Sequence, residues 1–172
     1  NAATDLGAST VSGTLGITSA GAVTDSGTLA ITGATTISAS GQDITLDESA
    51  STFGSLLLTG ANVAVTDAGA TDLGASTVGG TLGITSAGAV TDSGTLAITG
   101  ATTISASGQD ITLDESASTF GTLALTGANV AVTDAGAVDL GASTVSGTLG
   151  ITSAGAVTDS GTLAIAGATT IS

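Results

Sequence analysis

Gly27-Thr-Leu-Ala-Ile-Thr-Gly-Ala-Thr-Thr-Ile-Ser-Ala-Ser-Gly-Gln-Asp-Ile-Thr-Leu-Asp47 is a segment that this chain uses more than once. The same residues return from Gly94 to Asp114, and a close copy of the opening returns from Gly161 at the same offset. Self-similarity at a fixed period, here about 67 residues, is typical of repeat architectures, in which each unit buries its apolar side chains against its neighbours. The sequence therefore predicts one continuous array over residues 1–172, with units at 4–70 and 71–137 and a partial unit at 138–172. We expect it to be a segment of a longer repetitive chain.

Each unit contains nine short runs rich in Val, Ile, Leu and Thr, and each run is closed by Gly, Ser, Asn or Asp. In the first unit they span residues 5–8, 10–12, 13–18, 22–24, 27–32, 35–38, 43–47, 54–59 and 63–66. Such runs predict strands separated by turns. Within a strand, alternate side chains point to opposite faces. Position 57 is predicted to point outward, because Leu57 becomes Ala124 in the second unit while its neighbours remain Leu.

Nine runs in each repeat predict three coils of three strands, with about 22 residues per coil. The predicted fold class is therefore all-β, a right-handed parallel β-helix (β-solenoid) with about three coils per 67-residue repeat. Two alternatives remain open. A string of small antiparallel sandwiches would have to build each core from a single repeat without Trp, Tyr or Cys, and disorder is opposed by the many β-branched residues. The apolar residues lack helical spacing.

The composition excludes several classes of function. The chain has no Lys, Arg, His, Cys, Met, Trp, Tyr or Pro, and its 14 acidic residues give a net charge of −14. Nucleic acids and anionic membranes are bound through Lys and Arg, so we expect neither partner. A Ser or Thr nucleophile needs His or Lys as its base, so no catalytic residue is predicted and we expect no enzyme activity. No run of 18 apolar residues exists, so we expect no membrane insertion.

The acidic residues have two interpretations. Carboxylates near turns that also contain Ser, Thr and Asn are the hard oxygen ligands that Ca²⁺ prefers. The calcium candidates are Asp25, Asp43, Asp47, Glu48, Asp67, Asp92, Asp110, Asp114, Glu115 and Asp134. Neither a Gly-Gly-x-Gly-x-Asp repeat nor an EF-hand loop accompanies them. In the second interpretation these acids cap turns and keep the surface soluble, which predicts no cofactor at all.

Three further features favour structure over chemistry. Asp47 and Glu48 are adjacent, but without an aromatic sugar platform they fit a solvated turn better than a glycosidase pair. An ice-binding face needs a strict Thr ladder, and the unequal spacings between successive Gly-Thr/Ser-Leu phrases predict that none forms. The two Phe residues, Phe53 and Phe120, are predicted to fill the core.

Several runs carry a family resemblance. Gly-Thr-Leu-Ala-Ile-Thr-Gly-Ala-Thr-Thr-Ile, Gly-Gln-Asp-Ile-Thr-Leu-Asp, Leu-Thr-Gly-Ala-Asn-Val and Gly-Ala-Val-Thr-Asp-Ser-Gly resemble the repeats of filamentous-haemagglutinin-type bacterial exoproteins. The resemblance implies a β-helical shaft at the bacterial cell surface or outside the cell. It also implies two-partner secretion, in which an outer-membrane partner exports the parent chain, and a role in adhesion or in a biofilm matrix.

Two functions follow as hypotheses. The first is a structural shaft of an extracellular fibre or adhesin, which assembles with copies of itself head to tail or laterally and has no catalysis. The alternative is an adhesin module that binds a carbohydrate or a receptor, with or without stabilising calcium. The first predicts polymers without any ligand, whereas the second predicts a saturable interaction in the isolated chain.

Overall fold

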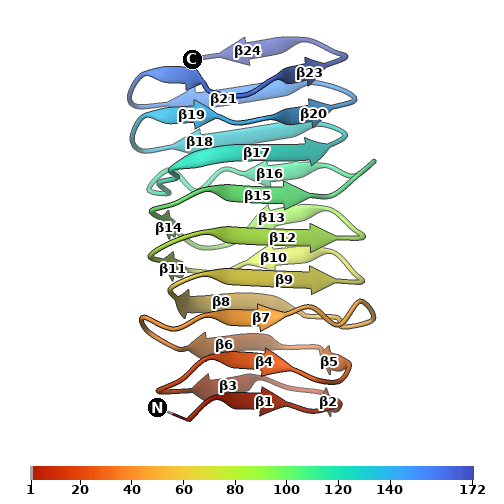
Figure 1. Ribbon diagram of the computed structural model, residues 1–172. Helices are drawn as coiled ribbons and strands as arrows, with labels where there is room; N and C mark the ends of the chain where they lie inside the picture. The colour runs from red at the N-terminus through yellow and green to blue at the C-terminus, as the bar shows by residue number, and fades with distance from the viewer. Residues whose placement is uncertain (1) are drawn as a thin grey trace.

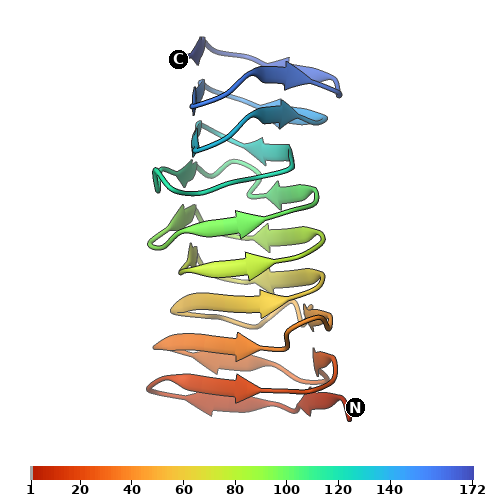
Figure 2. The ribbon, with the colours of Figure 1, turned by 90° about the vertical axis from the view of Figure 1, so that its left-hand side faces the viewer.

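A computed structural model describes residues 2–172 as one continuous coil that rises along a single axis (Figures 1 and 2). These residues form 24 strands and no helix, and the strands pair in parallel. In Figure 1 the chain runs from left to right in front and from right to left behind while it climbs, so the coil is right-handed. The predicted all-β, right-handed parallel β-solenoid is confirmed.

Two eleven-stranded sheets form the front and the back of the coil in Figure 1. The front sheet contains β1 (Thr4–Leu6), β4 (Val23–Asp25), β7 (Ile44–Leu46), β9 (Val63–Asp67), β12 (Leu82–Ser86), β15 (Thr102–Ser105), β17 (Thr122–Gly127), β19 (Val138–Leu140), β20 (Ser143–Val145), β22 (Val157–Asp159) and β23 (Leu163–Ile165). The back sheet contains β3 (Leu15–Thr18), β6 (Ala34–Ser38), β8 (Ser55–Gly60), β10 (Thr71–Leu73), β11 (Ser76–Val78), β13 (Val90–Asp92), β14 (Leu96–Ile98), β16 (Ile111–Leu113), β18 (Val130–Asp134), β21 (Leu149–Ser153) and β24 (Thr169–Ile171). A third, two-stranded sheet pairs β2 (Ser9–Val11) with β5 (Leu29–Ile31).

The strand register measures the length of each turn. Thr4 pairs with Val23 and Leu82 pairs with Thr102, so one turn takes roughly 20 residues. The shortest step on the front sheet joins Leu123 to Leu140. The coils are thus somewhat shorter than the predicted length of about 22 residues. The register therefore fits more than three turns into each repeat.

One repeat occupies seven half-turns, which is an odd number. A half-turn is one pass of the chain along the front or the back of the coil. In the first unit, the four front half-turns are formed by β1 with β2, by β4 with β5, by β7 with residues 51–53, and by β9. The three back half-turns are formed by β3, by β6 and by β8. A strand therefore lies on the opposite sheet in the next unit. The six-residue strand β8 is in the back sheet, and its copy β17 is in the front sheet; β1, β10 and β19 alternate front, back, front (Figure 1).

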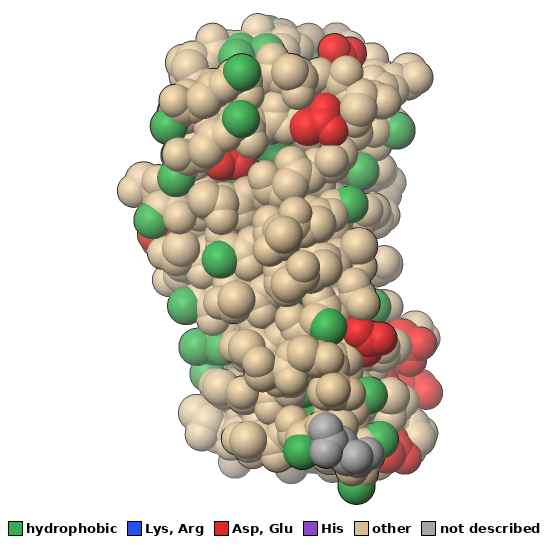
Figure 3. All heavy atoms as spheres, turned by 60° about the vertical axis from the view of Figure 1, so that its left-hand side comes forward, with side chains coloured by type: hydrophobic (Ala, Val, Ile, Leu, Met, Phe, Trp, Pro, Cys, Tyr) green, Lys and Arg blue, Asp and Glu red, His purple; other side chains and the backbone are tan. Residues whose placement is uncertain are grey.

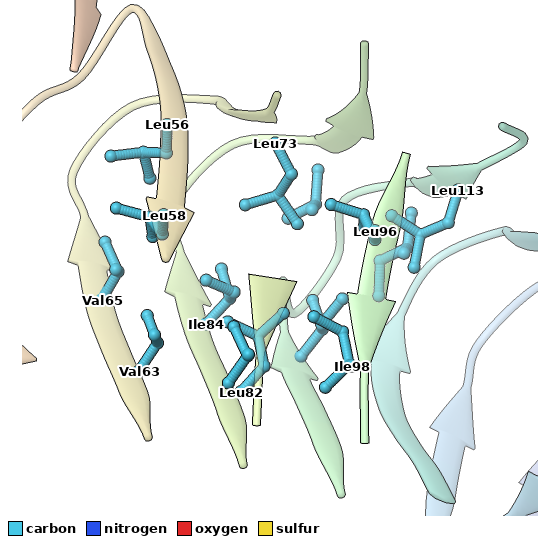
Figure 4. Close-up of a cluster of buried hydrophobic side chains, with 14 of the residues drawn as sticks. Leu56, Leu58, Val63, Val65, Leu73, Leu82, Ile84, Leu96, Ile98 and Leu113 are labelled. Carbon is cyan, nitrogen blue, oxygen red and sulfur yellow. The ribbon is translucent and has the colours of Figure 1, made fainter. Parts of the chain in front are cut away.

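The core fills the narrow slot between the two sheets. Leu56 and Leu58 enter it from the back, Val63 and Val65 enter it from the front, and all four are at most 3% exposed (Figure 4). The same alternation continues through the stack as one cluster of buried Leu, Ile and Val side chains. Because each turn contributes only a few side chains, the core exists only where turns are stacked. The aliphatic core predicted from the strand pattern is confirmed.

The prediction that the side chain at position 57 points outward is also confirmed. β8 alternates between half-buried and buried side chains, and Leu57 belongs to the half-buried set. Its side chain lies over Gly74 of the next turn, where an added Cβ would be 2.7 Å from Leu57 Cγ. Phe53 and Phe120 are each 6% exposed and belong to the core cluster, as predicted.

Candidate functional site: the two faces of the solenoid

Outward hydroxyl side chains form in-register columns on both faces. On the front face, β-pairing aligns Thr66, Thr85, Ser105, Thr126 and Thr144 on consecutive turns. On the back face it aligns Thr18, Ser38, Thr59 and Thr77. Neighbouring members are about 4.8 Å apart, the spacing of paired strands. Ser105 and Ser38 interrupt the threonines, so these columns are mixed Ser/Thr columns and not the strict Thr ladder that an ice-binding face needs.

The mixed columns were not predicted, because the Gly-Thr/Ser-Leu phrases do not stack on one another. Their separations span different numbers of half-turns, whereas each mixed column joins residues from unlike runs, such as Thr66 and Thr85. A second column on the front face, two residues earlier in each strand, contains Ala64, Gly83 and Thr103. The face thus carries one column of hydroxyls beside a column of mostly small residues.

Exposed acids and uncharged strand faces alternate along the solenoid. At the level of β10, β13 and β16 the back face carries or adjoins Asp72, Asp110, Asp114 and Glu115, while the front strands β9, β12, β15 and β17 present no outward charge. One repeat away the pattern reverses, with Asp5, Asp43, Asp47, Glu48 and Asp139 on or beside front strands. In Figure 3 the acidic side chains gather in the lower and upper parts of the molecule and are sparse between them.

Four of the calcium candidates are buried, and two of them lie deepest inside the coil. Asp67 and Asp134 are 1% and 2% exposed at the ends of β9 and β18. Gly69 N donates to Asp67 Oδ1 at 2.8 Å and Thr71 Oγ1 donates to Asp67 Oδ2 at 3.2 Å. Phe120 N donates to Asp134 Oδ2 at 3.1 Å. These carboxylates cap backbone N–H groups where the chain turns between sheets.

Burial has a measurable consequence for Asp67. Desolvation raises the pKa of its carboxyl above the ordinary value of 3.8, and hydrogen bonds from Gly69, Thr71 and the backbone N–H of Phe53 offset part of that rise. Desolvation disfavours the charged form of an acid, whereas hydrogen bonds to the carboxylate favour it. Burial at this turn therefore makes the ionised form of Asp67 less favourable than it is in water.

Asp25 and Asp92 cap the turn that contains Asp47 and its copy. Asp47 N donates to Asp25 Oδ1 at 2.9 Å, and Asp114 N donates to Asp92 Oδ1 at 2.8 Å. Asp25 Oδ2 is buried without a hydrogen-bond partner, while the equivalent oxygen of Asp92 accepts from Glu115 N at 3.4 Å. Desolvation raises the pKa of Asp92, and the charges of Asp114 and Glu115 add to the rise. These carboxylates are directed at backbone donors.

Asp43 and Asp110 begin short polar ladders along one edge. Asp43 Oδ1 accepts from the backbone and side-chain nitrogens of Asn62 at 3.2 and 2.9 Å. Asn62 Oδ1 then accepts from Thr81 N at 3.0 Å, one turn further on. Asp110 makes the corresponding contacts with Asn129. The two remaining pairs of candidates, Asp47 with Glu48 and Asp114 with Glu115, are exposed or half-buried in turns.

The structure brings some of these candidates together as caps and ladders. Within residues 2–172, no group of three or more acidic side chains is close enough together to hold a metal ion. Each buried candidate uses at least one carboxylate oxygen to accept a backbone N–H. The geometry thus accounts for these acids as turn caps, and calcium binding stays an untested prediction.

Asp72 and Asp139 were not singled out by the sequence reasoning, although they point outward from β10 and β19. Asp139 accepts from Ser160 Oγ at 2.6 Å and Thr122 Oγ1 at 3.0 Å, and its pKa is lowered, chiefly by the Ser160 hydrogen bond. Ser93 Oγ donates to Asp72 at 2.7 Å. The sequence does carry a signal for their outward position. In the runs Thr-Asp-Leu and Val-Asp-Leu, the residues on both sides of the Asp point inward, so the Asp points outward. Surface carboxylates here bind hydroxyl donors from neighbouring turns.

Two hollows lie along the coil. The larger, of about 420 Å³, is lined by uncharged residues that include Ser40, Thr59, Asn62, Thr77 and Gly79. The smaller, of about 360 Å³, lies between Thr144 and Ala166. Position 79 is Gly here, whereas the equivalent residues of the other units are Ser12 and Ser146. The missing side chain leaves this part of the larger hollow open.

Comparison with known proteins identifies a family without an assigned function. A family model described as "Repeats of unknown function (DUF5649)" matches residues 1–59, 60–126 and 127–172. The middle match has the length of the sequence repeat. No curated protein and no solved structure matches the chain. Within residues 2–172, no helix has the length and hydrophobicity needed to cross a membrane.

Proposed function

Since the chain belongs to the family of repeats of unknown function DUF5649, we propose that it is a structural section of an extracellular bacterial fibre. In this role the solenoid is a load-bearing shaft that projects whatever the parent protein carries at its tip. The filamentous-haemagglutinin resemblance adds the proposal that the parent chain leaves the cell through an outer-membrane partner. It also suggests adhesion or matrix building as the use of the fibre.

The observation that carries this proposal is the unbroken stack. Backbone ladders run parallel to the axis from β1 to β22, and a single apolar cluster accompanies them. Force along the axis is shared by the hydrogen bonds and apolar contacts of each turn with the next. The absence of Cys from the chain suits export, because no disulfide can cross-link it before it folds.

Electron microscopy of chains with increasing numbers of repeats tests the shaft. Each repeat adds three and a half strand spacings, so we expect straight rods that lengthen by about 17 Å per repeat. Compact particles, or flexible strings of beads, would contradict the proposal.

The location of the protein is tested separately by treating intact cells that express the parent protein with protease. The proposal requires the repeats to be cleaved from outside while cytoplasmic markers survive.

A second function has one observation in its favour. The larger hollow collects the hydroxyls of Ser40, Thr59 and Thr77 beside glycine backbone, which suits a neutral, hydroxyl-rich ligand such as a glycan segment. Titration with neutral oligosaccharides, followed by NMR, would show saturable shifts at these residues. Gly79→Ser copies the other units and should abolish binding without unfolding the chain. Equal shifts in both chains, or none, would remove this alternative.

A further inference from the structure

We propose that the solenoid packs side by side with parallel, in-register copies of itself, the front face of one chain against the back face of the next. This proposal deepens the structural role above, on which it rests, by naming the lateral partner and its orientation. The partner is a second copy of this chain. This packing follows from the odd number of half-turns per repeat and from the distribution of charge.

Charge limits how two copies can approach. Each chain carries −14 and no positive side chain, so an acidic region of one copy repels an acidic region of another. Favourable contact between copies requires that acids on one chain face uncharged residues on the other. Any packing that places acid against acid loses this advantage.

The alternation between faces meets that requirement at every level. Where the front face is uncharged, at β9, β12 and β15, the back face at the same height holds Asp72 and adjoins the acids around β16. Where the front face is acidic, at β1, β7 and β19, the back strands β3, β6, β8 and β21 present no outward charge. Translating a copy sideways without rotation therefore sets an acidic region against an uncharged one throughout. Packing front to front would set acid against acid at β1 and β7.

The uncharged regions also provide donors for the facing carboxylates. Thr85 is exposed in the middle of the front hydroxyl column. Within the chain, surface carboxylates already take such donors, as in Ser160 Oγ to Asp139 at 2.6 Å and Ser93 Oγ to Asp72 at 2.7 Å. Hydrogen bonds to a carboxylate are stronger than those between neutral groups. Hydroxyl columns opposite acids thus make complementary surfaces.

The area is large enough for a specific contact. Eight strand steps separate β1 from β22, so a face is ~38 Å tall and ~20 Å wide, or roughly 750 Å². A stable interface covers about 800 Å² per partner. The contact is heterologous, because front meets back, so it repeats from chain to chain without closing. Longer arrays of repeats enlarge the area in proportion.

Sedimentation velocity over a concentration series tests the contact with a matched pair of variants. Thr85 and Thr91 are both exposed strand residues, on the front of β12 and the back of β13. Thr85→Asp puts a charge opposite an acidic region, and we expect association to weaken about five- to tenfold. Thr91→Asp adds the same charge opposite hydroxyls, and association should change by less than about twofold. Thr85→Lys should strengthen it.

The outcomes separate this proposal from the structural role. Equal weakening by both Asp variants would mean that net charge alone governs association and would overturn the face-to-back contact. A wild-type chain that stays monomeric up to millimolar concentration would also overturn it, while rods of the expected length would still support the shaft. Circular dichroism of each variant establishes that the fold is intact. Weakening by Thr91→Asp alone would require a different packing.

Discussion

One buried hydroxyl has no partner in each full repeat. Thr35 and Thr102 are fully buried, and their Oγ1 atoms accept and donate no hydrogen bond. In β15 the register places Thr102 between Leu82 and Leu123. An unsatisfied buried polar group costs free energy, whereas an isosteric apolar group does not. Thr102→Val should therefore raise the free energy of unfolding by about 1 kcal/mol.

Thr103→Val is the control for that substitution. Thr103 is the next residue of β15 but is exposed, so the same chemical change should alter stability by less than about 0.5 kcal/mol. Urea unfolding measures both. Destabilisation by Thr102→Val would show that the hydroxyl makes a hydrogen bond that the core geometry does not reveal.

Buried carboxylates predict that acid stabilises this protein. Because the pKa values of Asp67 and Asp92 are raised in the folded state, the fold binds protons more readily than the unfolded chain. Their contribution to stability is complete below the unfolded pKa, near 3.8, and is lost as the pH rises through the folded pKa. The melting temperature should therefore increase between pH 7 and pH 4.

Asp67→Asn separates this effect from the general repulsion among acids. The amide resembles the protonated carboxyl, so the variant should be more stable than wild type at pH 7 and should gain less on acidification. Asp47→Asn removes an exposed charge instead and is the control for the general repulsion among acids. Identical pH profiles for wild type and Asp67→Asn would rule out Asp67 as the source.

At the scale of a strand, inward and outward positions should differ sharply. Leu58 is 1% exposed and faces the core, so Leu58→Ala should cost about 2–5 kcal/mol. Leu57 lies outward in the same strand, and its copy in the second unit is already Ala124. Leu57→Ala should cost less than about 1 kcal/mol. Equal losses in urea unfolding would contradict the assigned facing of β8.

Glycines at the edge of the coil permit adjacent turns to stack closely. A Cβ added at Gly100 would lie 2.6 Å from Gly80 O, in the turn below, whereas one at Gly83 meets nothing nearer than 3.8 Å. Gly100→Ala must therefore displace backbone and should lower stability by about 1–3 kcal/mol. Gly83→Ala, in the middle of β12, should be neutral or slightly stabilising. Thermal melts of the two variants compare these sites directly.

Local structure was largely predictable because each strand carries its own signal. Every one of the nine runs in the first unit overlaps a strand, from β1 at Thr4–Leu6 to β9 at Val63–Asp67. Alternation of apolar residues then identified the inward side chains. The acids at turns were also recognised, although their use as caps on backbone N–H groups depends on which turn lies beside them.

The phase of the repeat was not predictable from those local signals. By phase we mean that one repeat fills an odd number of half-turns, so that each strand changes sheet from one repeat to the next. Two short strands and one long strand can span the same half-turn, as β10 and β11 do beside β8. Nine runs therefore resemble three triplets while they fill seven half-turns. The alternation of faces, the hydroxyl columns and the outward acids Asp72 and Asp139 all follow from this phase. It is determined by how the turns pair.

Spin-label distances test the half-turn phase most directly, and the absence of Cys makes labelling simple. Thr85 and Thr144 share the front hydroxyl column and are three strand steps apart. Thr85 and Thr152 are equivalent residues of successive repeats, on β12 and β21, in opposite sheets. Paired Cys substitutions should give about 14 Å between backbone sites for 85/144 and more than about 20 Å for 85/152. A separation for 85/152 as short as that for 85/144 would mean a whole number of turns per repeat and would contradict this account.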